Sequence, residues 1–182
     1  MAAPGVVLLD KPPGISSFAA LSSVKRAFDT RRVGHTGTLD PFASGLLIAL
    51  VGKATRCARY LTGLDKTYEA VVAFGEERDT CDRTGDIVCT ADPPCAERVA
   101  AVVTSFKGEI TQVPPLYSAI HVSGKRAYQL ARAGERAELP ARVVRIYELR
   151  VREVAPATLR FEVRCSSGTY IRALARDIGR AA

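Results

Sequence analysis

The chain has 182 residues, of which 47% are hydrophobic and 25% are charged, and its formal net charge is +7. This is the composition of an ordinary globular protein and excludes a wholly disordered chain. The longest uninterrupted apolar run, Leu46–Val51, is far shorter than the roughly 20 residues of a bilayer span. No positively charged segment precedes an apolar stretch at the N-terminus, so the sequence predicts no signal peptide.

The N-terminal part of the chain predicts short strands separated by helices. An apolar run at Val6–Asp10 ends in a Lys-Pro-Pro-Gly turn, and Ser16 or Ser17 can cap a helix that runs to about Phe28. The polar, glycine-containing residues 31–38 predict a loop or an irregular strand. The elements expected next are a buried strand at Leu46–Val51, a helix at Lys53–Leu64, an alternating strand at Lys66–Phe74 and a charged loop at 75–86.

The C-terminal part predicts a hairpin between helices. Four apolar residues on one face predict a helix that ends at Gly108. A strand is expected at Tyr117–Val122, after Pro114-Pro115. A second helix is expected at Lys125–Ala133, with Gly134 at its end. Two alternating strands, with three residues between them for a turn, and a helix from near Tyr170 complete the chain. We therefore expect an α+β fold with a mixed, largely antiparallel sheet flanked by helices, in one domain spanning residues 1–182. The two strands of the hairpin are Arg142–Val154 and Thr158–Cys165.

The basic residues are concentrated at the C-terminal end. Residues 1–120 hold 13 basic and 13 acidic residues, whereas residues 121–182 hold 13 basic and 6 acidic ones. Of the 26 basic residues, 20 are arginine, whose guanidinium matches phosphate oxygens. This pattern favours a nucleic-acid partner, and the alternative is an ordinary solvated basic surface.

Several chemistries are excluded by missing motifs. The chain has no phosphate-binding P-loop, no dinucleotide-binding glycine motif, no nucleophile elbow and no His-Glu-x-x-His. With only His35 and His121, a histidine-rich metal site cannot form, and we expect no bound metal. The five cysteines contain no Cys-x-x-Cys pair, which favours free thiols in a reducing compartment. An enzyme built from this sequence has to use carboxylates, tyrosines or thiols.

The most informative segment is Gly34–Gly45, which has three glycines, donors at His35 and two threonines, and one carboxylate, Asp40. Glycines allow tight turns and close approach of a ligand to the backbone. The alternative is that Asp40 caps a helix with Pro41 at its first position. However, Gly45 and an apolar strand follow within five residues, which leaves little helix to cap.

Five segments together resemble the TruB-type pseudouridine synthases, a family that isomerises a uridine in the T-loop of tRNA at position 55. Gly34–Gly45 is similar to the catalytic loop of that family. The other four follow the family's order, and the resemblance covers residues 5–179. They are Lys11–Ser17, the strand from Lys66 with the acidic loop to Gly85, the insert made of Gln112–Ala119 and Gly124–Tyr128, and Cys165–Arg172.

The resemblance implies a role for each of several residues. Asp40 is the essential carboxylate and Arg172 is the cation that pairs with it. Tyr68 stacks on the flipped uracil, Tyr170 is a second pocket aromatic, and His35 fills the space that the flipped base vacates. Tyr68 and Tyr170 could instead be packing residues, and Arg172 one more phosphate contact. Lys11 is expected to support the catalytic loop rather than to take part in the chemistry.

The resemblance also implies a cofactor-free enzyme with the pseudouridine synthase fold that acts on the T-arm of tRNA. It further implies a cytoplasmic monomer with no obligatory protein partner and no membrane. The family continues into a further strand and helix and often a PUA domain, so we expect a C-terminally incomplete catalytic domain without the PUA domain. The main alternative is a non-catalytic RNA-binding or RNA-chaperone module. A nucleosidase-like hydrolase and a guide-RNA-dependent synthase fit less well.

Overall fold

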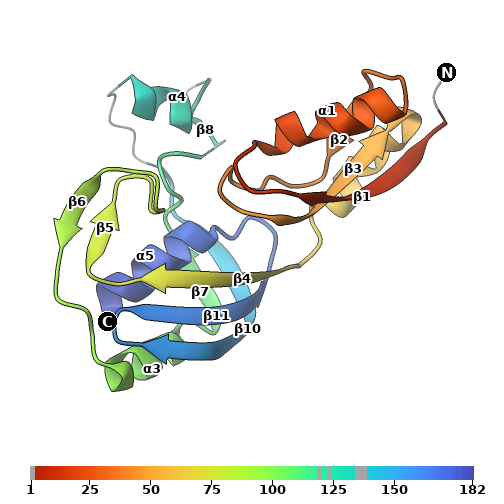
Figure 1. Cartoon of the computed structure of the whole chain (residues 1–182). Coiled ribbons are helices and arrows are strands. Elements are labelled where there is room, and N and C mark those ends of the chain that lie inside the picture. The colour runs from red at the N-terminus through yellow and green to blue at the C-terminus, as the bar shows by residue number, and fades with distance from the viewer. Residues whose placement is uncertain (1–2, 119, 123, 134–138) are drawn as a thin grey trace. The chain divides into compact units, whose positions relative to one another are not determined.

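The computed structural model describes residues 3–118, 120–122, 124–133 and 139–182. The chain forms two compact units, Met1–Leu64 and Asp65–Ala182, which we call unit 1 and unit 2. Both units combine helices with antiparallel strands (Figure 1). This confirms the expected α+β fold.

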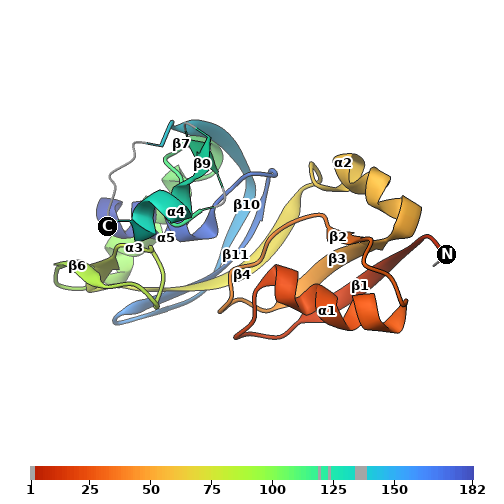
Figure 2. The same cartoon turned by 90° about the horizontal axis from the view of Figure 1, so that it is seen from above.

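Unit 1 is a three-stranded sheet in the order β1-β3-β2 with a helix along one face (Figure 2). The helix begins where predicted because the Ser16 side chain accepts a hydrogen bond from the backbone N–H of Ala19 at 3.1 Å. Its buried face, Ala20, Leu21 and Val24, packs on the alternate residues of β3 that point the same way. The elements are β1 (Gly5–Lys11), α1 (Ser17–Ala27), β2 (Val33–His35), β3 (Gly45–Val51), η1 (Gly52–Cys57) and α2 (Ala58–Leu61).

Unit 2 is built on a four-stranded antiparallel sheet in the order β4-β11-β10-β7. One face of β11 is buried and carries Leu159, Phe161 and Val163, which form a core with residues of α3 and α5. The other face carries charged residues, as the alternation predicted. The main elements are β4 (Lys66–Ala73), α3 (Ala96–Ser105), β7 (Gly108–Gln112), β10 (Arg142–Ala155), β11 (Thr158–Cys165) and α5 (Ile171–Ala181).

The remaining elements of unit 2 are two small hairpins and a short helix. They are β5 (Glu76–Arg78), β6 (Ile87–Thr90), β8 (His121–Val122), β9 (Lys125–Arg126) and α4 (Ala127–Arg132). None of the helices within the described ranges is long and apolar enough to cross a membrane.

Four local predictions differ from the structure. The helix expected at Lys53–Leu64 starts as the 3-10 helix η1, because the Thr55 side chain donates to the Gly52 carbonyl at 2.8 Å and competes with α-helical bonding. The loop expected at 75–86 includes the short strand β5, which pairs with β6 directly after the loop, although β5 shows no apolar alternation. The β10–β11 turn needs only the two residues between Ala155 and Thr158.

The fourth difference concerns the region after Pro114-Pro115. A strand was expected at Tyr117–Val122, but a turn in which the Ser118 N–H donates to the Leu116 carbonyl delays it until β8. The helix expected from Lys125 begins only at Ala127, because β9 pairs with β8 first. Gly134, expected to end that helix, lies outside the described residues.

Candidate active site

The segment Gly34–Gly45, which we call the Asp40 loop, is held by a hydrogen bond from a buried lysine of unit 1. Lys11 is fully buried, and its Nζ donates to the carbonyls of Pro12 at 2.8 Å, Ile15 at 2.9 Å and Pro41 at 3.4 Å. The backbone N–H of Gly14 donates to the same Pro41 carbonyl at 2.7 Å. The Lys-Pro-Pro-Gly turn therefore holds the residue directly after Asp40, in the supporting role predicted for Lys11.

Ser17 holds the residue directly before Asp40. Its buried hydroxyl donates to the Leu39 carbonyl at 2.9 Å and accepts from the Leu39 N–H at 2.8 Å. Since Ser17 is also the first residue of α1, the helix and the turn clamp the backbone on both sides of Asp40. The backbone from which the Asp40 side chain extends is therefore fixed before any substrate arrives, which restricts the positions open to the carboxylate.

Asp40 does not cap a helix. The chain turns at Pro41 and Phe42, the Ala43 N–H donates to the Asp40 carbonyl at 3.1 Å, and β3 begins at Gly45 with φ of 118°. The capping alternative is therefore wrong, and the half-buried carboxylate needs another explanation. His35 ends β2, and its buried Nδ1 has no hydrogen-bond partner within the described residues.

In unit 2, Arg172 lies in the first turn of α5 with its side chain only 10% exposed. One terminal nitrogen donates to the Thr80 carbonyl at 2.8 Å and lies 3.6 Å from the Asp82 carboxylate. The other donates to the Tyr117 carbonyl at 3.0 Å. Two segments of unit 2, the β5–β6 loop and the turn at Tyr117, therefore orient the guanidinium, which argues against a mobile phosphate contact.

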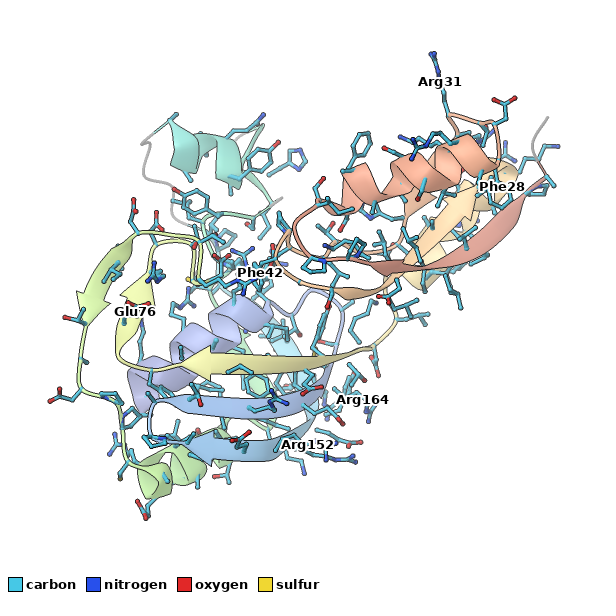
Figure 3. All side chains as sticks on the ribbon, in the orientation of Figure 1. Phe28, Arg31, Phe42, Glu76, Arg152 and Arg164 are labelled. Carbon is cyan, nitrogen blue, oxygen red and sulfur yellow. The ribbon has the colours of Figure 1, made fainter. Side chains whose placement is uncertain are left out.

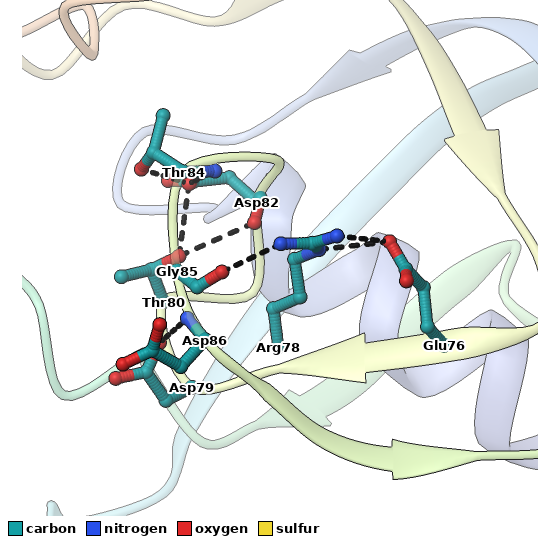
Figure 4. A network of polar contacts seen from close by, with 8 residues as sticks. All are labelled: Glu76, Arg78, Asp79, Thr80, Asp82, Thr84, Gly85 and Asp86. Carbon is teal, nitrogen blue, oxygen red and sulfur yellow. Dashed lines mark hydrogen bonds and ion pairs between the residues drawn. The ribbon is translucent and has the colours of Figure 1, made fainter.

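The loop between β5 and β6 positions Asp82 (Figure 4). The Asp82 carboxylate accepts hydrogen bonds from the N–H and the hydroxyl of Thr84 and from the hydroxyl of Thr80. Arg78 stabilises the same loop, because it pairs with Glu76 and donates to the Gly85 carbonyl at 2.7 Å. Gly85 is required here, because a Cβ would collide with the side chains of Asp79 and Thr80.

Asp82 is a candidate site residue that sequence reasoning missed. Its loop lies in one of the five segments that resemble the family, but three aspartates, at 79, 82 and 86, lie within eight residues there. Only the structure distinguishes Asp82, which contacts Arg172, from Asp79, which closes the loop by accepting from the Asp86 N–H at 3.0 Å.

The two tyrosines predicted for the site are both half-buried in unit 2. Tyr68 lies on β4 and packs against the core, which agrees with the packing alternative without testing a contact to substrate. Tyr170 precedes α5, and the Arg142 guanidinium lies 5.5 Å from the centre of its ring. Its N–H donates at 2.9 Å to the side-chain oxygen of the fully buried Gln112, a second positioning residue that the sequence did not reveal.

A thiol is a poor alternative to a carboxylate here. Cys81 lies beside Asp82, and burial raises the pKa of its thiol, with Arg176 opposing the shift only in part. A raised pKa leaves less of the nucleophilic thiolate. Within the ranges that the structure describes, no three His, Cys, Asp or Glu side chains are grouped as metal ligands.

Asp40 belongs to unit 1 and Arg172 to unit 2. The backbone around Asp40 and the guanidinium of Arg172 are each held by contacts within their own unit, and the pairing of the two residues stays a prediction. The same holds for the contacts of Tyr68, Tyr170 and His35 with substrate.

Solved structures with similar folds include the Cbf5-Nop10-Gar1 complex. A chain of that complex is 33% identical, with a TM-score of 0.72 over 97% of this chain and 44% of the other. A structure of an H/ACA RNP bound to a substrate RNA containing 2'-deoxyuridine gives a TM-score of 0.69 at 29% identity, over 97% of this chain and 42% of the other.

Curated relatives and a family model agree with these likenesses. The tRNA pseudouridine synthase B of Bordetella avium is 49% identical over 97% of this chain and 74% of its own length. That of Mycobacterium avium is 46% identical over 100% of this chain and 60% of its own length. The model of the TruB family pseudouridylate synthase N-terminal domain matches residues 25–171. These matches confirm the resemblance found in the motifs, and the chain belongs to the TruB family of pseudouridylate synthases.

Proposed function

We propose that this chain converts a uridine in the T-loop of tRNA, at position 55, to pseudouridine, with Asp40 as the essential carboxylate and without a cofactor. The observation that carries the proposal is the clamp on the Asp40 backbone, in which Lys11, Gly14 and Ser17 hold both neighbours of one carboxylate. Family membership supplies the reaction class, and the curated relatives are named for tRNA.

The chemistry requires a carboxylate at the junction of sugar and base. The bond from C1′ to N1 breaks, the uracil rotates, and C1′ joins C5, with no redox change and no net hydrolysis. Asp40 either attacks the sugar or the base covalently, or acts as a base at the sugar. The target base is stacked in the loop of the RNA and has to be flipped out to reach the carboxylate.

The other residues act around this centre. Arg172 pairs with Asp40 and aims the carboxylate, and Asp82 and two backbone carbonyls keep the guanidinium oriented. Tyr68 stacks on the uracil, since an aromatic face holds a base in any rotation. Tyr170 forms a second wall, and His35 takes the place of the flipped base in the RNA stack.

We place the protein in the cytoplasm, as a monomer whose partner is the T-arm of tRNA and which needs no other protein. Support comes from the substrate named for the relatives and from the five cysteines, which are all free. Free thiols are typical of a reducing compartment.

The test is a tritium-release assay on a T-loop RNA hairpin that carries C5-tritiated uridine. Forming the C1′–C5 bond expels the C5 hydrogen, so we expect release of one tritium per target uridine. A hairpin with cytidine in place of the target uridine is the control and should release none. Tight binding of the hairpin without any release would instead support the non-catalytic RNA-binding or chaperone module.

A further inference from the structure

The two units divide the charge of the chain unequally. Unit 1 holds eight basic and three acidic residues, a formal charge of +5, whereas unit 2 holds 18 basic and 16 acidic residues, a charge of +2. The excess of basic residues after residue 120 is offset within unit 2 by the excess of acidic residues in 65–120. Most of the net charge therefore belongs to the smaller unit.

Ion pairs in unit 2 show this offset directly. Arginines on the charged face of β10 and β11 and along α5 lie against carboxylates, and Arg152 and Arg164 extend from that face (Figure 3). A paired guanidinium contributes less to the field that attracts an anion. The pairs are Arg150–Glu148, Arg152–Glu162, Arg160–Glu69, Arg164–Asp65, Arg176–Asp177 and Arg180–Glu77.

In unit 1, by contrast, several basic side chains lie close together at the C-terminal end of α1. Lys25 and Arg26 lie in the last turn, and Asp29, with φ of 44°, reverses the chain so that the Thr30 N–H reaches the Lys25 carbonyl at 3.1 Å. Arg31 is thereby brought back beside the helix end. An open depression of about 390 Å³ is lined there by Lys25, Arg26, Asp29, Thr30 and Arg31.

The helix dipole explains only part of this cluster. Cations in the last turn stabilise a helix, and the Lys25 ammonium also lies 4.4 Å from the centre of the Phe18 ring. Arg31 and Arg32 lie beyond the helix, and Arg31 extends into solvent (Figure 3). Among the described residues none of these cations forms an ion pair, and Asp29 is the one carboxylate in the lining.

We propose that this basic patch, Lys25, Arg26, Arg31 and Arg32, binds backbone phosphates of the RNA substrate outside the Asp40 loop. The inference rests on the proposed function for the identity of the RNA. Ser17, which holds the Asp40 loop, lies at the first residue of α1, and Lys25 and Arg26 lie in its last turn, about 12–14 Å away along the helix at 1.5 Å per residue. The patch therefore adds affinity for RNA and takes no part in the chemistry.

Charge reversal of Arg31 tests this inference. Arg31→Glu should weaken the binding of full-length tRNA about tenfold, and the slope of log affinity against log salt should become shallower by about 1. Arg31→Lys keeps the charge and should bind nearly as the wild type does. Lys107→Glu makes a matched charge reversal at an exposed site of unit 2 and should leave affinity and slope unchanged. Turnover at saturating tRNA should be equal in all four proteins.

Unchanged tRNA affinity in Arg31→Glu would overturn the inference, and so would an equal loss in Lys107→Glu, which would indicate a general charge effect. Binding of the wild type to vesicles of anionic lipid in preference to tRNA, abolished by Arg31→Glu, would assign the patch to a membrane surface instead. If the wild type forms no pseudouridine while Arg31→Glu still weakens tRNA binding, the proposed function fails and the patch stands. If pseudouridine forms and Arg31→Glu binds normally, only the patch fails.

Discussion

Lys11 is a buried cation whose charge is compensated by backbone carbonyls. Burying an ammonium is costly unless its donors are satisfied, and here three carbonyls satisfy all of its N–H groups. One of these carbonyls belongs to Pro41, so the same contacts that compensate the charge also fix the residue after Asp40. Stability and site geometry are coupled at this position.

Replacing Lys11 with Met should therefore lower both stability and turnover. The three carbonyls lose their donor, which costs about 2–4 kcal/mol of unfolding free energy, and the loosened loop should reduce kcat more than it changes KM. Urea denaturation and steady-state tritium release measure the two effects. Lys53→Met, at an exposed position of η1, is the matched control. An unchanged urea midpoint in Lys11→Met would contradict the assigned support role.

The proposed role of Arg172 depends on the orientation of its guanidinium as well as on its charge. Lysine keeps the charge but loses the planar fork that contacts two carbonyls and Asp82. Arg172→Lys should thus be nearly as damaging as Arg172→Ala, with single-turnover rates reduced about 100-fold by the misplaced partner of Asp40. Asp82→Asn should slow the reaction through the same contact, so its effect should not add to that of Arg172→Ala. Near-normal turnover in Arg172→Lys, or additive losses, would show that the two residues act separately.

At the scale of elements, the sequence predicted those with strong periodicity. Helix α1 and the β10–β11 hairpin follow from their apolar spacing and from the Ser16 cap. The short strands β5 and β6 were missed because charged residues such as Glu76 and Arg78 carry no apolar alternation, and their pairing depends on contacts across the loop. Helix α5 was predicted, but its attachment to this hairpin through Arg180 and Glu77 is visible only in the fold.

The Glu77–Arg180 pair makes the attachment of α5 depend on pH. The hydrogen bonds from Arg180 lower the pKa of Glu77 below its ordinary value. A carboxyl with a lowered pKa in the folded state stabilises the fold above its unfolded pKa of about 4.3, and this contribution is lost as the pH falls through the folded value. Glu77→Gln should therefore be less stable than wild type at pH 7, with the difference shrinking below pH 4. Urea unfolding at both pH values measures this, and a difference that is the same at both would contradict it.

At the scale of the whole molecule, the sequence motifs nominate Asp40 and Arg172 as site residues, but they do not reveal the contacts around Arg172 and Tyr170. Asp40 and Arg172 follow from motifs, whereas Asp82 and Gln112 are defined only by the side chains they reach in the folded unit. The position of the basic patch also depends on folding. Divided at residue 120, the sequence has its whole net positive charge in the C-terminal part, but divided into structural units it has most of that charge in residues 1–64.

The proposed reaction needs no metal ion. The proposed reaction is completed by a carboxylate and its cation, so treatment with EDTA followed by removal of the chelator should leave the tritium-release rate unchanged. Metal analysis of the purified protein should find less than one ion per chain. A rate lost on chelation and restored by one divalent cation would contradict this part of the mechanism.

The central claim is that the Asp40 carboxylate performs the chemistry. The most direct test is single-turnover tritium release by Asp40→Asn, with Asp92→Asn, the same change in an exposed loop of unit 2, as the matched control. Asparagine fits the clamped backbone, so fold and RNA affinity should match the wild type in both variants. We predict that Asp40→Asn releases no measurable tritium while Asp92→Asn reacts normally. A rate for Asp40→Asn within about tenfold of the wild type, which is about 1.4 kcal/mol of activation free energy, would contradict the claim.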